Sequence, residues 1–233
     1  MLKGLFITGT DTEVGKTVVA AALMHRYRKE LRLRYWKPIQ TGIEQDDDTA
    51  IVRRLGECGD DEILDEGIRL KRPVSPHLAA KLSGQEITIE QVYKTLMTNA
   101  DQNVSWIIEG AGGALVPIND SEQMVDLARM LSLPVLVVAS TQLGTINHTL
   151  LTIESLRKRA LIVAGIVMVG ESNAYNREAI EFYSTVSVLG EMPRFSNLNA
   201  ESLGSWAHGE LDQDRVLLDH LKLAHHPQLN FKP

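Results

Sequence analysis

The stretch GTDTEVGKT, residues 9–17, decides the fold of this 233-residue chain. It follows the apolar run 5–7 and precedes the helix-prone run 18–23, so a strand, a glycine-bearing turn and a helix start succeed one another. In such a turn, backbone N–H groups and the positive end of the helix dipole face one concavity that holds a polyphosphate. Lys16 is placed to reach the β- and γ-phosphates, and the Thr17 hydroxyl to ligate Mg²⁺. The sequence therefore predicts a nucleotide-binding protein, with a chance Gly-Lys-Thr at a helix start as the alternative.

The glycine spacing in this stretch departs from the regular P-loop pattern. The pattern G-x-x-x-x-G-K-[ST] requires a glycine where Thr10 stands, and Gly9 lies one residue earlier. The cradle is thus a slightly stretched version of the pattern.

Composition favours a globular protein with one large domain. The chain is 44% hydrophobic and 23% charged, which is ordinary for soluble proteins, and no apolar run approaches the roughly 18 residues that span a bilayer. Residues 1–3 do not open a signal peptide, so we expect a cytoplasmic protein without a membrane partner. Cys58 is the only cysteine, which excludes an internal disulfide. The net charge of −6 argues against a nucleic-acid partner.

Short β-branched runs alternate with helical patterns along the chain, which is typical of βαβ units. We expect an α/β fold of the P-loop NTPase type, with a doubly wound, mainly parallel sheet and helices on both faces. The predicted domain spans residues 1–233, and residues 225–233 are expected to be a frayed tail. Predicted strands cover residues 5–8, 33–37, 104–109, 134–139 and 161–169. Apolar residues at helical spacing predict helices within 89–97 and 124–131.

Polar and glycine-rich segments follow four of these strands. They are residues 9–17, 37–42, 109–113 and 140–145. In an open parallel sheet, ligands bind beyond the carboxyl ends of the strands, so we expect these segments to meet at one edge. Segments 44–48 and 69–77 lack periodicity or contain prolines, and both are interpreted as loops near that edge.

Two acidic segments are candidates for the metal site. Glu109 ends an apolar strand, where a carboxylate suits a Mg²⁺ contact beside the γ-phosphate. Residues 46–48 are three consecutive aspartates, and Asp48 is the best placed because it adjoins the helical segment 49–55. A loop-capping acid is the alternative for Glu109, and a solvated loop the alternative for the aspartates.

Other polar residues are candidates for contacts with a second substrate. Lys37, at a strand end before Pro38, can neutralise charge on a transferring phosphoryl group, or be an exposed strand-end lysine. Thr41 is either a turn residue or a substrate contact. Residues 145–147 start a helix whose free N–H groups form a second possible anion site, with an N-cap as the other role of Thr145. His77, in a loop, is interpreted as structural.

These pieces in this order resemble the dethiobiotin synthetase family of the deviant P-loop ATPase superfamily. The resemblance rests on GTDTEVGKT at 9–17, KPIQTG at 37–42, SPH at 75–77, EGAGG at 109–113, QLGTINH at 142–148 and GEMP at 190–193. These motifs span most of the chain and are specific as a set. The stretched glycine spacing is a mark of this family.

The resemblance implies an ATP-dependent ring closure in which 7,8-diaminononanoate and CO₂ become dethiobiotin. A carbamate on one amine is phosphorylated by ATP, and the second amine attacks the mixed anhydride. The family works with Mg²⁺ as a homodimer, in which a side chain of the partner subunit completes the substrate site.

Roles for individual residues follow from the same resemblance. Catalytic roles fall to Lys37, Lys16 and Thr12, metal contacts to Thr17, Asp48 and Glu109, and substrate contacts to Thr41, Leu143, Gly144, Thr145, Ile146 and Asn147. Nucleotide contacts fall to Glu13, Val14, Gly15, Lys16, Thr17, Val18, Asp48, Glu109, Gly110, Ala111, Gly112, Pro193, Arg194 and Phe195.

The chain also departs from the family pattern. Where the family often has an asparagine that reads adenine, this chain has Val169 and Gly170, with Asn173 as a distant substitute. The choice of nucleoside triphosphate therefore stays open. The aromatic residue that reaches the partner subunit is either Phe182 or Tyr183.

Two other functions use the same cradle. One is a partner-binding nucleotide-switch ATPase of the partition or positioning type, which usually carries a second lysine early in the cradle, where this chain has Asp11 and Thr12. The other is a kinase that phosphorylates a small acid, which does not account for Lys37 together with the anion site at 143–147.

Overall fold

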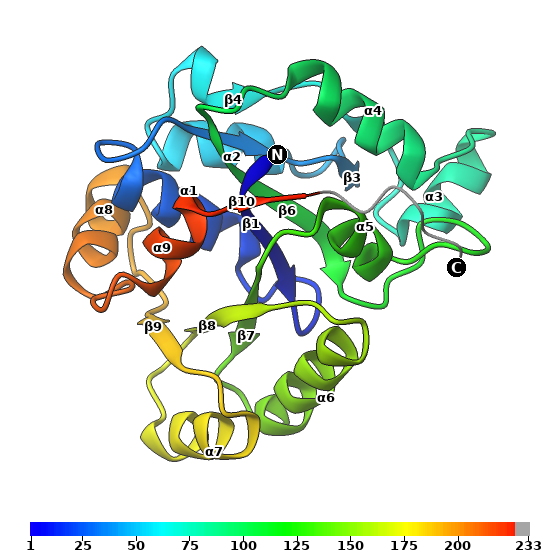
Figure 1. The fold of residues 1–233 in the computed structure, drawn as a ribbon. Helices are drawn as coiled ribbons and strands as arrows, with labels where there is room; N and C mark the ends of the chain where they lie inside the picture. Colours follow the sequence, from blue (N-terminus) through cyan, green and yellow to red (C-terminus); the bar gives the residue numbers. More distant parts are fainter. Residues whose placement is uncertain (227–233) are drawn as a thin grey trace.

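A parallel sheet runs through the centre of the structure, a computed structural model that describes residues 1–226 (Figure 1). Its strand order is β4-β2-β6-β1-β7-β8-β9, and β10 pairs antiparallel with the start of β1. β3 and β5 form a separate parallel pair. The strands are β1 (Leu2–Gly9), β2 (Leu33–Trp36), β3 (Ile39–Thr41), β4 (Ile63–Leu64), β5 (Ile68–Leu70), β6 (Ser105–Gly113), β7 (Val135–Ser140), β8 (Val163–Val169), β9 (Val188–Met192) and β10 (Ala224–His225).

Helices cover both faces of this sheet. Side chains of α1, α2, α8 and α9 share one apolar core with one face, and side chains of α3 to α7 share another core with the opposite face. The fold predicted from the sequence is confirmed. The helices are α1 (Lys16–Tyr27), α2 (Asp48–Leu55), the short 3₁₀ helix η1 (Asp60–Glu62), α3 (Pro76–Ser83), α4 (Ile89–Asn99), α5 (Met124–Leu131), α6 (Thr145–Lys158), α7 (Ala174–Ser184), α8 (Ala200–Gly209) and α9 (Val216–Lys222).

The strand register brings the polar strand ends together. β1 lies between β6 and β7, with Ile7 opposite Glu109 and Gly9 opposite Val138. β2 lies on the other side of β6, with Trp36 opposite Ile108, so the residue after β2 lies beside Glu109. The phosphate loop, Lys37, Glu109 and segment 140–145 thus follow neighbouring strands at one edge.

Some local expectations differ from the structure. Segment 69–77 is not one loop, because Arg69 lies in β5 and Pro76 is the first residue of α3. Proline is tolerated at the first helical position, where its missing N–H would have no helical partner. His225, expected in a frayed tail, pairs with Leu2, and residues 227–233 lie outside the described residues. No helix within residues 1–226 combines the length and apolar character needed to cross a bilayer.

Candidate active site

The phosphate loop joins β1 to α1 at the centre of the sheet edge. Gly15 stands at the N-cap of α1 with φ 98°, and Val14 anchors the loop in the core. Lys16 is buried, and its Nζ donates to the backbone oxygen of Asp11 at 2.9 Å. Burial, followed by the charge of Lys37, lowers the pKa of Lys16 to about 8, against the opposing pull of nearby carboxylates. The Lys16 side chain therefore lies over the phosphate loop, where it would contact a bound phosphate.

The other residues of the predicted cradle lie around this lysine. Thr12 and Glu13 are exposed on the loop, and Thr17 and Val18 are half-buried in the first turn of α1. Gly110, Ala111 and Gly112 continue β6 beyond Glu109.

Lys37, Asp48, Glu109 and Thr17 form one cluster beside the phosphate loop, named the carboxylate cluster below. Lys37 Nζ lies 2.7 Å from Asp48 Oδ2 and 2.7 Å from Glu109 Oε1. Thr17 Oγ1 lies 2.9 Å from Asp48 Oδ1 and 3.1 Å from Glu109 Oε1. Lys37 Nζ also donates to the backbone oxygen of Gly110 at 3.2 Å. The three residues predicted to contact a metal thus meet Lys37, one of the two lysines predicted to be catalytic, from α1, α2 and β6, while Lys37 follows β2.

The opposite charges in the carboxylate cluster stabilise the charged forms of Lys37 and Asp48. Burial lowers the pKa of Lys37, but the charges of Glu109 and Asp48 outweigh it, and the pKa is raised overall. Burial likewise raises the pKa of Asp48, but the charge and hydrogen bond of Lys37, with the Thr17 hydroxyl, lower it overall. At neutral pH, Lys37 is a cation and Asp48 an anion.

The aspartates at 46–48 have three different environments. Asp47 is the N-cap of α2, and its side chain accepts the N–H of Ala50 at 3.0 Å. Asp46 is exposed, and its backbone oxygen accepts the Gln40 amide at 2.6 Å. Asp48 begins α2 and faces Lys37 and Thr17. Capping of the helix by Asp47 therefore leaves Asp48 turned toward the carboxylate cluster.

The donor set of the carboxylate cluster fits Mg²⁺ carried by a nucleotide. Residues 1–226 contain no group of three or more His, Cys, Asp or Glu side chains arranged to hold a metal ion. Mg²⁺ is commonly bound through only one or two carboxylates, with substrate phosphates and water as its other ligands. Two carboxylates and the Thr17 hydroxyl match such a partial shell.

Tyr35 belongs to this site, although the sequence pattern did not reveal it. Its side chain is fully buried in β2, and its hydroxyl donates to Glu109 Oε2 at 2.9 Å. A tyrosine inside an apolar strand is typical of a core position. Only the pairing of β2 with β6 brings it to Glu109.

The start of α6 forms the second predicted anion site. Gly144 is the N-cap with φ 98°, and Leu143 is fully exposed. The Thr145 N–H donates to the backbone oxygen of Gln142 at 3.0 Å, and its hydroxyl donates to the backbone oxygen of Ser140. Ile146 and Asn147 follow in the first turn. The N–H and the hydroxyl of Thr145 are thus both bonded within the loop. The predicted anion site is therefore restricted to the neighbouring amides.

A cavity of about 460 Å³ connects the phosphate loop to α6. Thr12 lines one side of it, and His148 and Leu151 line the other. Its third wall is segment 113–117, at the end of β6 and beyond it. The cavity meets α6 along its middle, from His148 to Ser155, rather than at the helix start.

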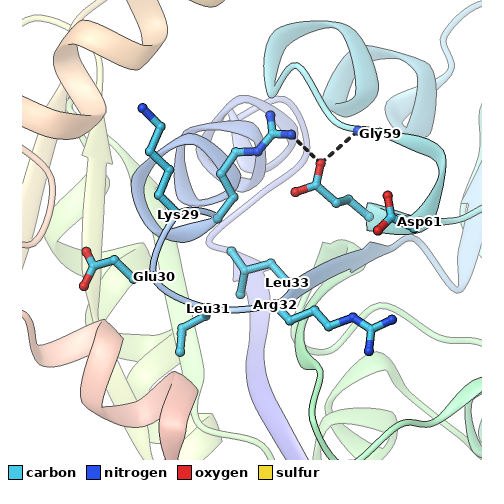
Figure 2. A pocket seen from close by; sticks show the side chains of 9 residues that line it. Lys29, Glu30, Leu31, Arg32, Leu33, Gly59 and Asp61 are labelled. Carbon is cyan, nitrogen blue, oxygen red and sulfur yellow. Dashed lines mark hydrogen bonds and ion pairs between the residues drawn. The ribbon is translucent and has the colours of Figure 1, made fainter.

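A second cavity, of about 600 Å³, lies at the opposite end of α1 (Figure 2). The labelled side chains of Lys29, Glu30 and Arg32 point in different directions there. Arg28 pairs with Glu62 at 2.6 Å and donates to the backbone oxygen of Gly56 at 2.9 Å. Because these charges are matched locally or spread apart, this cavity does not present a convergent site.

The predicted base-binding segment follows β9. The Gly170 N–H donates to the backbone oxygen of Met192 at 2.9 Å, which joins the ends of β8 and β9. The Val169 side chain lies close to Gly15: a Cβ added to Gly15 would be 3.2 Å from Val169 Cγ1. Asn173 caps α7 by accepting the N–H of Asn176 at 3.0 Å, so its side chain is already used.

Several predicted residues stand apart from the carboxylate cluster. Thr41 ends β3 and is half-buried, Pro193 and Arg194 are exposed, and Phe195 packs against the core. Within residues 1–226, none of these four donates or accepts a side-chain hydrogen bond with the cluster. Their predicted contacts would have to be made through a bound ligand.

Comparison with known families identifies close sequence relatives. Residues 3–202 match the family described as an AAA domain. The ATP-dependent dethiobiotin synthetase BioD of Brucella ovis is 42% identical over 199 residues, which is 85% of this chain and 90% of the relative. The protein of the same name from Brucella abortus (strain S19) is 41% identical over the same shares.

Solved structures with the same fold are far more distant in sequence. A ParA family ATPase from Chlorobium tepidum TLS has a TM-score of 0.56 and 13% identity, over 95% of this chain and all of that one. The septum site-determining protein MinD complexed with Mg-ADP, from Pyrococcus horikoshii OT3, has a TM-score of 0.56 and 14% identity, over 89% of this chain and 95% of that one. At such identities, the likeness establishes the fold alone.

Proposed function

Because the chain belongs to the ATP-dependent dethiobiotin synthetase family, we propose that it closes a urea ring on 7,8-diaminononanoate with CO₂ and ATP. The products are dethiobiotin, ADP and phosphate. The observation that carries the proposal is the carboxylate cluster, in which Lys37 joins Asp48 and Glu109 beside Thr17 of the phosphate loop. Such a cluster suits phosphoryl transfer to a second substrate bound at the same edge of the sheet.

The reaction has three steps that these residues can assist. One amine of the diamine adds to CO₂ and loses a proton, which gives a carbamate. A carbamate oxygen then attacks the γ-phosphorus, and ADP leaves. The second amine attacks the carbamate carbon of the mixed anhydride, and phosphate leaves as the urea ring closes.

The two lysines supply positive charge where negative charge develops. Lys16 would bind the β- and γ-phosphates from the loop, and Lys37, the residue after β2, would face the γ-phosphate and the carbamate. Lys16 contacts the Asp11 backbone oxygen and Lys37 contacts the two carboxylates, which supports the proposal that both ammonium groups bind anionic oxygens. We infer that Thr12, exposed on the loop, faces the reacting groups.

Mg²⁺ would be held by Thr17, Asp48 and Glu109, and it supplies charge neutralisation of the phosphates when bound. The two carboxylates provide the negative charge that such an ion requires. The ion pairs with Lys37 occupy the oxygens that such an ion would contact.

The carboxylate of the diamine would bind at the start of α6. The amides of Leu143, Gly144, Ile146 and Asn147 lie at the N-terminal end of α6, where the helix dipole favours an anion. Thr145 would hold the loop in shape through its bonds to residues 140 and 142. Thr41 would add a hydroxyl contact to the substrate.

The nucleotide would extend from the phosphate loop toward β8 and β9. Backbone groups at 193–195 would contact the base, beyond the point where Val169 approaches Gly15. ATP is the expected nucleotide, since the relatives are named as ATP-dependent enzymes. We propose that the chain folds as a single domain and acts in the cytoplasm, without nucleic-acid or membrane partners.

A homodimer would complete the substrate site. Leu143 beside the anion site is fully exposed, and Phe182 and Tyr183 on α7 are 76% and 68% exposed. Exposed apolar patches mark sites of protein–protein contact. One of these two aromatics would reach the substrate of the neighbouring subunit.

The partner-binding switch ATPase is not favoured. The likeness to the ParA family ATPase and to MinD is limited to the fold, whereas the synthetase relatives share 42% of residues across most of the chain. The cavity between the phosphate loop and α6 also supplies room for a small substrate.

Incubation with 7,8-diaminononanoate, [¹³C]bicarbonate, Mg²⁺ and each nucleoside triphosphate in turn tests this function. Mass spectrometry is expected to find dethiobiotin one mass unit heavier than the unlabelled compound, in the reaction with ATP. Nucleotide hydrolysis without a labelled cyclic urea in any of the reactions would contradict the proposal.

A further inference from the structure

Tyr35 touches the carboxylate cluster from a strand that contributes no other side chain to it. Tyr35 lies opposite Ile107 in the pairing of β2 with β6. Because side chains alternate along a strand, Glu109 lies on the same face as Ile107, roughly 6.6 Å further along. The length of a phenol side chain covers that distance, and the hydroxyl reaches Glu109 Oε2 at 2.9 Å.

The two oxygens of Glu109 have different partners. Oε1 accepts Lys37 Nζ at 2.7 Å and lies 3.1 Å from Thr17 Oγ1, whereas Oε2 accepts the Tyr35 hydroxyl. The last torsion of a glutamate side chain has broad preferences, so the carboxylate plane is not fixed by the side chain itself. A donor held rigidly on Oε2 sets that plane and leaves Oε1 directed toward the phosphate loop.

Tyr35 is suited to hold a carboxylate in place. Its side chain is fully buried in the core that β2 shares with α1, so its ring has a single packed position. A phenol ordinarily has a pKa of about 10, so it is a neutral proton donor at neutral pH. A neutral donor orients Glu109 without cancelling the negative charge that a metal ion requires.

We propose that Tyr35 is a positioning residue that orients Glu109 for the metal–nucleotide complex. The inference rests on the proposed function, because it takes Glu109 as a contact of the metal. Partners of this kind, which hold a metal ligand rather than the metal, commonly change metal affinity by about 10-fold or more when they are removed.

The test is Tyr35→Phe, which removes the hydroxyl and keeps the ring. Electron paramagnetic resonance can measure Mn²⁺ binding to the full-length protein in the presence of ADP. The Mn²⁺ dissociation constant of Tyr35→Phe is expected to rise about 10-fold, because Glu109 loses its fixed orientation. ADP binding without a divalent ion is expected to stay unchanged.

Tyr27 offers a matched control on α1. Its side chain is also fully buried, and its hydroxyl also donates to a buried carboxylate, that of Asp212. Tyr27→Phe should lower the melting temperature as Tyr35→Phe does, yet keep the Mn²⁺ affinity of the wild type. An equal loss of Mn²⁺ affinity in both variants would overturn the positioning role, since it would reflect general loosening of the core.

A Glu109→Gln variant separates failure of this inference from failure of the proposed function. Reduced Mn²⁺ affinity in Glu109→Gln, with wild-type affinity in Tyr35→Phe, would overturn the inference alone. Unchanged Mn²⁺ affinity in Glu109→Gln would overturn the metal role of Glu109 and the inference with it. In the double variant, Tyr35→Phe is expected to add no further loss, because it acts through Glu109.

A measurement on the wild-type protein does not depend on the variants folding. The chain has five tyrosines, so ¹³Cζ labelling of tyrosine gives a simple NMR spectrum. The Tyr35 resonance is expected to shift when Mg²⁺ is added to the ADP complex, while the Tyr27 resonance stays in place. A Tyr35 resonance that does not respond to Mg²⁺ would contradict the proposal.

Discussion

At the scale of single residues, Lys37 holds the site together before any ligand binds. Its ammonium group lies between two carboxylates at 2.7 Å from each, in a position that is only 3% exposed. A buried charge without a partner is strongly destabilising, so each member of the carboxylate cluster depends on the others. The same ammonium group would face a γ-phosphate held by the phosphate loop.

Replacing Lys37 should separate catalysis from nucleotide binding. We expect Lys37→Gln to lower the turnover of dethiobiotin formation by at least about 10²-fold, because positive charge facing the transferring group is lost. ADP affinity should change little, because Lys16 and the loop amides remain. Steady-state kinetics and calorimetric ADP titration measure the two quantities. An unchanged turnover would make Lys37 a purely structural residue.

The candidate residues were predictable from the sequence to different degrees. Lys16 and Thr17 follow from the motif, and Lys37 and Glu109 follow from their places at strand ends. Among the three aspartates, the sequence favours Asp48 as the metal contact only because it adjoins a predicted helix. The structure gives the physical reason, since Asp47 caps that helix. Tyr35 could not be found, because its hydrogen bond depends on which strands are neighbours.

At the scale of elements, the start of α6 shapes the proposed substrate site. Gly144 has φ 98°, a backbone conformation that residues with a Cβ adopt only at a cost of about 1–3 kcal/mol. A Cβ at Gly144 would have space, since its nearest neighbour is the His148 ring at 3.6 Å. Any effect of a substitution there would therefore come from the backbone.

Gly144→Ala is expected to raise KM for 7,8-diaminononanoate, because the amides at the helix start shift, while KM for ATP changes less. Initial-rate kinetics with each substrate varied in turn would measure both. Gly84→Ala is the matched control, because Gly84 also has a positive φ, 66°, at the end of α3, with no atom near its would-be Cβ. Equal rises of KM for both substrates in Gly144→Ala would argue against a substrate-specific role of this loop.

The segment from α9 to β10 should make the fold sensitive to mild acid. Burial lowers the pKa of His220, against the opposing charges of Asp219 and Asp212, and burial with the charge of His220 lowers the pKa of His225. Both histidines are therefore neutral in the folded protein at pH values where the unfolded chain begins to take up protons. Stability is accordingly lost as the pH falls below the ordinary histidine pKa of about 6.5.

We expect the melting temperature to fall between pH 7 and pH 5.5, because the unfolded chain takes up protons that the folded protein does not. Differential scanning fluorimetry would follow the change. His220→Gln should flatten the decrease, whereas His148→Gln, on the exposed side of α6, should keep it. A melting temperature that rises on acidification would contradict the proposed burial of neutral histidines.

At the scale of the whole molecule, the sheet order gathers residues that lie far apart in the sequence. β1 is flanked by β6 and β7, and β2 lies beyond β6, so four strand ends meet at one edge. The long apolar strands, and the polar segments that follow them, were predictable from local sequence patterns. The four-residue β2 was also predicted, whereas β3, β4, β5, β9 and β10 were not, because such short segments carry little periodicity and their pairing is non-local.

Association of two chains is the expected state in solution. Light scattering should give twice the chain mass of 25.9 kDa. We expect Phe182→Asp to give the single-chain mass and to lose activity, because a charge would replace an exposed apolar ring on α7. Leu223→Asp, at an exposed site after α9, should keep the wild-type mass. A wild-type protein with the single-chain mass would contradict the proposed shared substrate site.

The most direct test of the account is the ratio of phosphate released to dethiobiotin formed. If the γ-phosphate is cleaved only by attack of the carbamate, the two products should appear in equal amounts. Omission of either the diamine or bicarbonate should stop both. Phosphate release that continues at the same rate without the diamine, as in an ATPase that acts by binding a partner, would contradict the account.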